Sequence, residues 1–406
     1  MKKLIIFFAI RVFCIILVAN FFEPRDYEYG EIARNLVLGN GFSRSLDTGG
    51  RLYLTSSHAP VYPFFLFLFY KLGYHPVLFF IIQVIQAILA TFTILFVKKT
   101  AEVLCNRDVA EIASWLLGFY PPFIYHCTKL SPTIMFLFFL SFTLFLILKE
   151  SDKKKLSWIR TGLCLGITIL TDPIAFVLYP VIFVWFLLKK LSFLKFILII
   201  TISILTIAPW TIRNYIVHKR VVPVTTQFAV NFWIGNNPNA TGTDFYQVKS
   251  ADDYTLMTHS LPADIQDSLK NLSEIERADF YLGKAIEFIR SNPVQFFKLL
   301  IKKFYYYWWF IPSNEYLPTD REKYKTLLVI SYVPILFFGL FGIALALSFS
   351  KDNLLPILVV GFISLLYIVA HVGPLRYRMP VEIYLVLYAA VSLNFCYKKV
   401  MGIMST

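Results

Sequence analysis

Long runs of apolar residues, separated by shorter polar segments, extend along most of this 406-residue chain. A helix that crosses a bilayer needs about 20 predominantly apolar residues. Runs that approach or reach this length lie at about 4–22, 77–97, 109–127, 131–149, 158–171, 174–188, 195–212, 326–348, 354–371 and 379–397. The pattern predicts an all-α polytopic membrane protein with about ten transmembrane helices. The two runs between 158 and 188 are short, so a re-entrant hairpin turning at Thr171-Asp172-Pro173 is an alternative there.

The first polar segment, residues 23–75, predicts two surface helices. Apolar residues in the first helix follow the spacing of one helical face, and they are Tyr29, Ile32, Ala33, Leu36 and Val37. Asp26 stands where an N-cap is expected, and Gly39 stands where a C-terminal glycine is expected. The second helix is the very apolar stretch Val61–Leu72. An acidic residue therefore lies at the mouth of the first span, at the start of a juxtamembrane helix.

The second polar segment, residues 213–325, predicts a mixed external loop. Val221–Val224 and Phe228–Ile234 are expected as short strands. Ser273 and Glu276 form a capping-box pattern that starts a helix to about Arg290. A further helix follows Asn292-Pro293 and ends in an aromatic cluster typical of a membrane interface. The chain thus divides into an N-terminal bundle (1–212), this loop (213–325) and C-terminal spans (326–406).

Composition and charge support this topology. The chain is 57% hydrophobic and 16% charged, whereas soluble domains carry about 25% charged residues. The formal net charge is +14, and the excess of Lys and Arg lies in short loops that fall on one side when the spans alternate. The positive-inside rule makes that side the cytoplasm. Both termini are then cytoplasmic, and 23–75, 213–325 and 372–378 are external.

Three further features of the sequence narrow the classes of function. The N-terminus resembles a signal peptide, but we interpret it as an uncleaved first span in which Arg11 snorkels toward the cytoplasm. The five scattered cysteines predict no disulfide framework. No metal-ligand spacing, phosphate-binding glycine loop or nucleic-acid signature is present, so no metal site is indicated, although dependence on a divalent metal stays open.

Four motifs, in order along the chain, resemble those of the GT-C superfamily of polytopic glycosyltransferases. The similarity is to the protein O-mannosyltransferase-like group, which includes the lipid A aminoarabinose transferases. The motifs are Arg25–Phe42, Ala59-Pro60-Val61-Tyr62-Pro63, Pro209–Asn214 followed by Gly235–Gly242, and Arg376-Tyr377-Arg378-Met379-Pro380 with Glu382. All four fall on the predicted external side.

The resemblance implies transfer of a sugar from a polyprenyl-phosphate donor on the outer face of the cytoplasmic membrane. The acceptor would be an envelope lipid, a glycan or a protein. In such enzymes an acid of the first external loop acts as the general base, which points to Asp26, with Glu28 sharing or replacing that role. Cations must hold the leaving phosphate. The expected substrate-binding residues are Arg376, Arg378, Tyr377, Arg213, Lys129 and His58.

Purely structural roles are the alternative interpretation of these residues. Asp26 could serve only as a helix cap, Asp172 could only form a turn, and Arg376 and Arg378 could only anchor the chain at the interface. For the whole chain the alternatives are a non-catalytic transporter of lipid-linked sugars or an inactive GT-C relative. Inverted repeats and several charges within the spans would favour a transporter, and the sequence shows neither clearly.

Overall fold

The computed structural model describes residues 2–45, 52–149, 155–243, 245–247, 254–256, 269, 272–309, 321–371, 373 and 375–402. Its apolar segments form a helical bundle, whose members are α1 (Lys2–Val18), α4 (Pro76–Leu104), α5 (Arg107–Gly118), α6 (Pro121–Cys127), α7 (Thr133–Lys149), α8 (Lys155–Thr171), α9 (Leu178–Leu188), α10 (Phe193–His218), α15 (Arg321–Phe349), α16 (Leu354–Ala370) and α17 (Met379–Val400). The all-α membrane architecture predicted from the sequence is confirmed.

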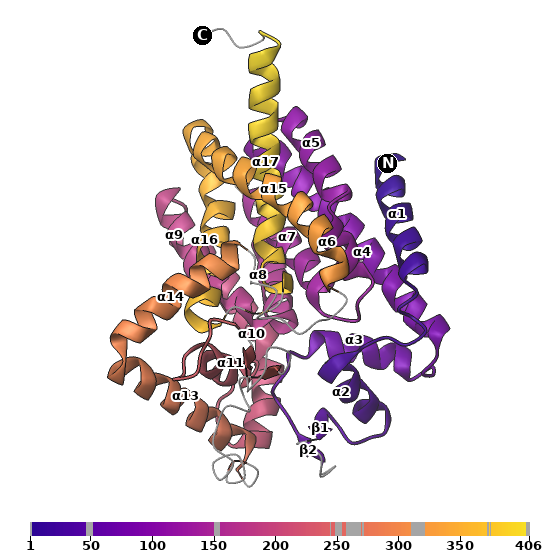
Figure 1. Ribbon diagram of the computed structural model, residues 1–406, viewed down its shortest axis with the longest axis vertical. Coiled ribbons are helices and arrows are strands. Elements are labelled where there is room, and N and C mark those ends of the chain that lie inside the picture. Colours follow the sequence, from indigo (N-terminus) through magenta and orange to yellow (C-terminus); the bar gives the residue numbers. More distant parts are fainter. Residues whose placement is uncertain are drawn as a thin grey trace.

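The polar segments form a second layer at one end of the bundle (Figure 1). This layer contains α2 (Tyr27–Val37), β1 (Ser43–Ser45), β2 (Leu52–Leu54), α3 (Val61–Tyr70), α11 (Gln227–Gly235), β3 (Phe245–Gln247), β4 (Tyr254–Leu256), α13 (Glu274–Ser291) and α14 (Pro293–Trp308). The strands form two antiparallel hairpins, β1–β2 and β3–β4. Short 3-10 turns are η1 (Pro173–Val177), η4 (Lys351–Asn353) and η5 (Leu375–Tyr377). Both termini lie toward the other end of the bundle.

Five of the described helices are long and apolar enough to cross a membrane, namely Pro76–Leu104, Phe193–His218, Val329–Ser348, Lys351–Ala370 and Met379–Val400. The expected number of ten spans is not confirmed. The expected span 109–127 is wrong as a single helix, because the chain breaks between α5 and α6 at Phe119-Tyr120. Pro121 and Pro122 lack the amide hydrogens that would continue α5, and they open α6 instead.

The helix α17 runs through the middle of the bundle (Figure 1) and has 83% of its apolar window buried. It packs closely against α15, where a Cβ on Gly342 would lie 1.8 Å from the carbonyl oxygen of Tyr388. Only glycine allows the two backbones to approach so closely. This central helix begins at Met379, immediately after the Arg376–Arg378 motif, so a rigid element fixes that motif at the end of the bundle that carries the polar layer.

Arg11 is fully buried, so the expectation that it snorkels toward the cytoplasm is wrong. Its guanidinium donates to the carbonyl oxygens of Phe7 at 2.9 Å, Gly118 at 3.1 Å and Leu117 at 3.4 Å. Two of these carbonyls belong to the last turn of α5, and the residues four positions further on, Pro121 and Pro122, have no amide hydrogen to donate to them. The Leu117 carbonyl also accepts from the Tyr120 amide at 3.4 Å. Arg11 therefore closes the end of α5 that the proline break leaves open.

Lys303 fixes α14 to the bundle. Its side chain is fully buried and donates to Gly235 O at 3.2 Å, Asn236 Oδ1 at 3.0 Å and Val369 O at 3.0 Å. The two carbonyls lie at the C-terminal ends of α11 and α16. Burial lowers the pKa of Lys303 to about 7. One side-chain amino group thus binds the ends of two helices and holds the polar layer against the bundle.

Some of the helix caps and strands predicted for the polar layer are present in the structure, and others are not. The capping box of Ser273 and Glu276 is present at the start of α13, and Gly39 ends α2 with a positive φ of 80°. The strand expected at Phe228–Ile234 is wrong, since these residues lie in α11, and Val221–Val224 forms no strand. A short apolar run fits a buried strand or a helix equally well. All five cysteines are free, as expected.

Candidate active site

Asp26 stands at the N-cap position of α2, as predicted, but its side chain accepts no capping hydrogen bond. The cap interpretation of Asp26 is therefore wrong. Its carboxylate is 7% exposed and forms an ion pair with Arg34. The same oxygen, Oδ2, accepts from the Tyr70 hydroxyl at 2.8 Å and from the Tyr74 hydroxyl at 3.3 Å. Asp26 is held by α2, α3 and the segment that follows α3.

Glu28 lies in the first turn of α2 and has different neighbours. Burial opposes ionisation of its carboxyl group, but His58, its own backbone amide, Arg44 and Arg376 together hold the pKa of Glu28 below the usual value. These side chains come from the β1–β2 hairpin, the segment before α3, and η5. The pKa of Glu28 is thus set by side chains from three segments that are distant in sequence.

His58 lies beside this carboxylate. Its Nδ1 is 2.9 Å from the Ser57 hydroxyl oxygen, and its ring meets the Tyr29 ring edge-on with centroids 4.9 Å apart. Burial lowers the pKa of His58 to about 4, with Arg44 and Arg376 acting in the same direction and Glu28 against them. The imidazole is therefore neutral at neutral pH and has one nitrogen to donate and one to accept.

Asp172 lies at the turn between α8 and η1 and acts as a turn former, because its carboxylate accepts from the Ile174 amide at 3.1 Å. Burial raises its pKa to about 6, against the opposing effects of that amide and of Arg376. Arg376 therefore acts electrostatically on Glu28, His58 and Asp172. This cation, expected from its motif, therefore influences the protonation of all three groups.

A row of stacked tyrosines adjoins Arg376. The guanidinium carbon lies 5.2 Å from the Tyr377 ring centroid, and the Tyr377 ring stacks on Tyr367 at 4.9 Å and 18°. Tyr367 in turn stacks on Tyr307 at 6.1 Å. The rings come from η5, α16 and α14. Aromatic faces of this kind pack well against the C–H faces of a ligand and against cations.

Arg378, the second cation of the motif, is buried inside the protein. Its Nε is 2.6 Å from Glu382 Oε1, and its Nη1 donates to the carbonyls of Tyr307 at 3.0 Å and Trp309 at 2.9 Å. The guanidinium also lies 3.6 Å from the Tyr332 ring centroid. Arg378 therefore ties the end of α14 to the start of α17.

Two other expected cations lie apart from Glu28. Arg213, on α10, donates to the carbonyl oxygens of Thr55 at 2.6 Å and Phe42 at 3.0 Å, which fixes the β1–β2 hairpin to α10. The ammonium of Lys129 lies 4.7 Å from the centroid of the Tyr125 ring. The arginines named as acting on the pKa of Glu28 are instead Arg44 and Arg376.

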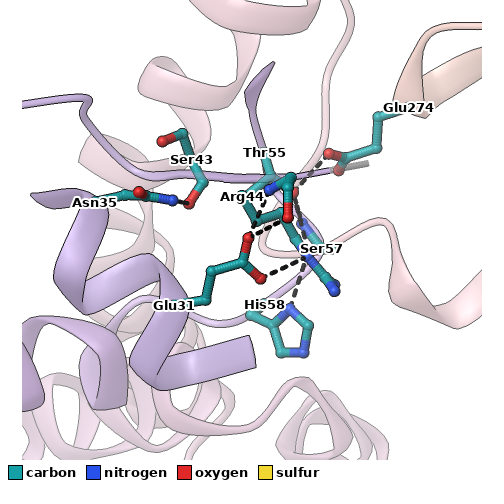
Figure 2. A network of polar contacts seen from close by, with 9 residues as sticks. Glu31, Asn35, Ser43, Arg44, Thr55, Ser57, His58 and Glu274 are labelled. Carbon is teal, nitrogen blue, oxygen red and sulfur yellow. Dashed lines mark hydrogen bonds and ion pairs between the residues drawn. The ribbon is translucent and has the colours of Figure 1, made fainter. Parts of the chain in front are cut away.

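Arg44 is a site residue that the sequence interpretation missed. It follows the Gly41-Phe42 motif by two residues on β1, and its Nε lies 3.8 Å from Glu31 Oε2 (Figure 2). That nitrogen is buried and has no hydrogen-bond partner among the described residues. Its position two residues after the Gly-x-Gly-Phe motif is the feature of the sequence that could have identified it. Within the described residues, no group of three His, Cys, Asp or Glu side chains is placed to hold a metal ion.

Comparison with known proteins agrees with this architecture. Residues 57–212 match the dolichyl-phosphate-mannose-protein mannosyltransferase family. The structure is similar to ArnT from Cupriavidus metallidurans bound to undecaprenyl phosphate, with a TM-score of 0.56 at 12% identity. The chain has the GT-C fold. It is also similar to the Archaeoglobus fulgidus oligosaccharyltransferase tethered to an acceptor peptide, with a TM-score of 0.60 at 13% identity.

The GT-C fold extends over nearly the whole chain. The match to ArnT covers 98% of this chain and 62% of ArnT, and the match to the oligosaccharyltransferase covers 99% of this chain and 50% of that protein. A third similar structure is the archaeal oligosaccharyltransferase AglB from the same organism, in complex with an inhibitory peptide and a dolichol-phosphate, with a TM-score of 0.55 at 13% identity. This match covers all of the present chain and 52% of AglB. No curated protein matches the sequence.

Proposed function

We propose that this chain is an integral membrane glycosyltransferase that moves a sugar from a polyprenyl-phosphate donor to an acceptor on the outer face of the cytoplasmic membrane. The single observation that carries the proposal is that the charges of Arg44 on β1 and Arg376 on η5 favour the ionised form of Glu28. A carboxylate under the influence of two cations suits a reaction in which a proton is removed while a phosphate leaves. The neighbours bound to undecaprenyl phosphate and dolichol-phosphate support this class of donor.

In the proposed reaction, an acceptor oxygen attacks the anomeric carbon of the donor sugar. The bond between that carbon and the phosphate oxygen breaks, and its electron pair stays on the polyprenyl phosphate. The acceptor proton passes to a carboxylate of α2, which acts as a general base. Negative charge grows on the phosphate as it leaves, so nearby guanidinium groups stabilise the transition state.

The geometry favours Glu28 over Asp26 as that base. The Asp26 carboxylate already binds Arg34, Tyr70 and Tyr74, whereas Glu28 is the acid that experiences the charges of the cluster. We assign Asp26 to holding the start of α2 in place. This changes the expectation from the sequence, in which Asp26 was the base and Glu28 the alternative.

Among the cations, we assign the donor phosphate to Arg376 and Arg44. The Nε of Arg44 has no hydrogen-bond partner among the described residues, although it lies 3.8 Å from Glu31 Oε2, and guanidinium groups match phosphate geometry. Arg378 and Arg213 are bound to carbonyl oxygens of the protein, so we assign them to the walls of the site. We assign Tyr377 and His58 to contacts with the sugar and Lys129 to the margin of the site.

The test is transfer of a labelled sugar from its polyprenyl phosphate in membranes that contain the protein. We expect Glu28→Gln to abolish transfer and Asp26→Asn to reduce it. Glu23→Gln, an exposed acid of the same segment, is the matched control and should keep the wild-type rate. Wild-type transfer by a folded Glu28→Gln protein with loss in Asp26→Asn would return the base to Asp26. Wild-type transfer by both would exclude an α2 carboxylate as base.

A further inference from the structure

The segment Thr55–His58, which carries His58 into the site, is anchored by residues far along the chain. Ser56 Oγ lies 2.8 Å from Asn214 Oδ1 and 2.8 Å from His218 Nε2, both on α10. The carbonyl of Thr55 accepts from Arg213 at 2.6 Å. These contacts fix the backbone of the segment, but none of them touches the His58 ring.

Glu274, the first residue of α13, holds the same segment from the opposite direction. Its Oε1 accepts from the Ser56 amide at 3.0 Å and from the Thr226 hydroxyl at 2.6 Å. Its Oε2 lies 2.6 Å from Thr55 Oγ1. A carboxylate only accepts hydrogen bonds, so the Thr55 hydroxyl proton points to Glu274. Glu274 therefore adds a contact from α13 to the site segment, beside those made by Arg213, Asn214 and His218.

The hydrogen bond from Thr55 to Glu274 determines the donors and acceptors in the contacts that continue to Ser57 and His58 (Figure 2). Thr55 Oγ1 also lies 2.9 Å from Ser57 Oγ. A hydroxyl has one proton and two lone pairs. Thr55 Oγ1 already accepts from the Ser57 amide at 3.0 Å, and its one proton goes to Glu274. We therefore assign the Ser57 hydroxyl as the donor in the contact between the two hydroxyl groups. Ser57 Oγ then accepts from His58 Nδ1, 2.9 Å away. The imidazole proton is thereby placed on Nδ1.

We propose that Glu274 is a positioning residue that sets the tautomer of His58 beside Glu28, through Thr55 and Ser57. In this tautomer Nε2 carries a lone pair and accepts a hydrogen bond from a hydroxyl group of the sugar or of the acceptor. The importance of this nitrogen for transfer rests on the proposed function, whereas the tautomer itself does not. The charged groups that act on His58 are Glu28, Arg44 and Arg376.

The direct test is the nitrogen chemical shifts of His58 in the purified full chain with labelled histidine, assigned with His58→Gln. We expect the wild-type imidazole to be neutral at pH 7 with its proton on Nδ1. Thr55→Val keeps the shape of the side chain but removes the hydroxyl, so Ser57 should donate to His58 and move the imidazole proton to Nε2. Thr55→Ser should restore the Nδ1–H form. A wild-type proton on Nε2, or an unchanged tautomer in Thr55→Val, would overturn the proposal.

The kinetic arm uses the same variants in the sugar-transfer assay. We expect Thr55→Val and Glu274→Gln to lower kcat about tenfold or more with a smaller change in KM, because misplaced groups lose transition-state alignment. Thr55→Ser should recover most of the rate. Glu276→Gln, in the capping box of the same helix, is the control for α13 stability. A tautomer change with wild-type kcat would reject a catalytic consequence. If the wild-type protein transfers no sugar, the proposed function fails, while the nitrogen shifts still report the tautomer.

Discussion

A Cβ atom on Gly30 would lie 1.9 Å from Cγ of Asp26. The Asp26 carboxylate therefore occupies the space beside the first turn of α2 that any other residue at position 30 would fill. This close contact orients the carboxylate toward Arg34 and Tyr70. The glycine lies within a helix, where it would otherwise cost about 1 kcal/mol relative to alanine. Its presence there is explained by the acid four residues before it.

Gly30→Ala should displace the Asp26 carboxylate and weaken its contacts with Arg34 and Tyr70. We expect a lower thermal midpoint, since overpacking costs about 1–3 kcal/mol, and reduced sugar transfer. Gly283→Ala is the matched control, because nothing lies within 4 Å of a Cβ at Gly283 in α13. That variant should be neutral or slightly stabilised. Equal thermal midpoints for Gly30→Ala and wild type would contradict the interpretation.

Substitutions of Arg376 and Arg378 should have different effects on sugar transfer and on thermal stability. Arg376→Gln is expected to lower transfer about a hundredfold, the scale seen when one group that stabilises developing charge is lost, with a smaller change in thermal midpoint than Arg378→Met. Arg378→Met leaves Glu382 buried without its partner, so it should destabilise the protein by about 3–5 kcal/mol. Thermal denaturation and transfer assays of both purified variants give the comparison. A strong loss of stability in Arg376→Gln would reverse our assignment.

Asp172 and His58 should give opposite slopes of stability against pH. The pKa of Asp172 is about 6 in the folded protein, against about 3.9 when unfolded. The folded state holds more protons between these values, so the free energy of unfolding falls as pH rises. The pKa of His58 is about 4, against about 6.5 when unfolded. Here the unfolded state holds more protons, and the free energy of unfolding rises with pH.

Thermal midpoints measured across this acidic range test those signs. Between about pH 4 and 6, the midpoint of Asp172→Asn should rise more steeply with pH than that of wild type. The midpoint of His58→Gln should rise less steeply. Parallel curves for wild type and both variants would show that neither group has the pKa shift on which the argument depends.

Lys303→Met should loosen the polar layer. The substitution keeps the apolar stem but removes the shared donor of Gly235 O and Asn236 Oδ1, while Val369 O keeps its bond from the Asn236 side-chain amide at 3.1 Å. An unsatisfied buried acceptor costs about 1–3 kcal/mol, so we expect a clearly lower thermal midpoint and faster proteolysis of the 213–325 segment. Lys302→Met alters the neighbouring lysine, which lies over the Tyr306 ring, and should have a small effect. Similar losses in both variants would count against the Lys303 anchor.

The features predicted correctly from the sequence are those encoded locally. The capping box at Ser273, the glycine end of α2 at Gly39 and the start of α14 at Pro293 each depend on a few adjacent residues. The all-α membrane architecture follows from hydropathy alone. Local signals also failed where they were ambiguous, as at Phe228–Ile234, where a short apolar run forms a helix.

The candidate site was predicted only in part, because its partners are distant in sequence. The motifs pointed to Asp26, Glu28 and Arg376, but no pattern along the chain indicates that Arg34 rather than a substrate binds Asp26. Likewise, the roles of Arg378 and Arg213 changed because their guanidinium groups found carbonyl oxygens elsewhere in the fold. The partners of these arginines are set by tertiary contacts, and such contacts cannot be read from the sequence.

The buried Arg11 also constrains the order in which this protein is assembled in the membrane. The carbonyl of Gly118 that it binds is 107 residues further along the chain. During synthesis α1 therefore emerges long before this partner exists, and a buried charge without its partners is costly. We infer that α1 settles into its final position only when α5 arrives. The packing of α1 is thus completed by the last turn of α5.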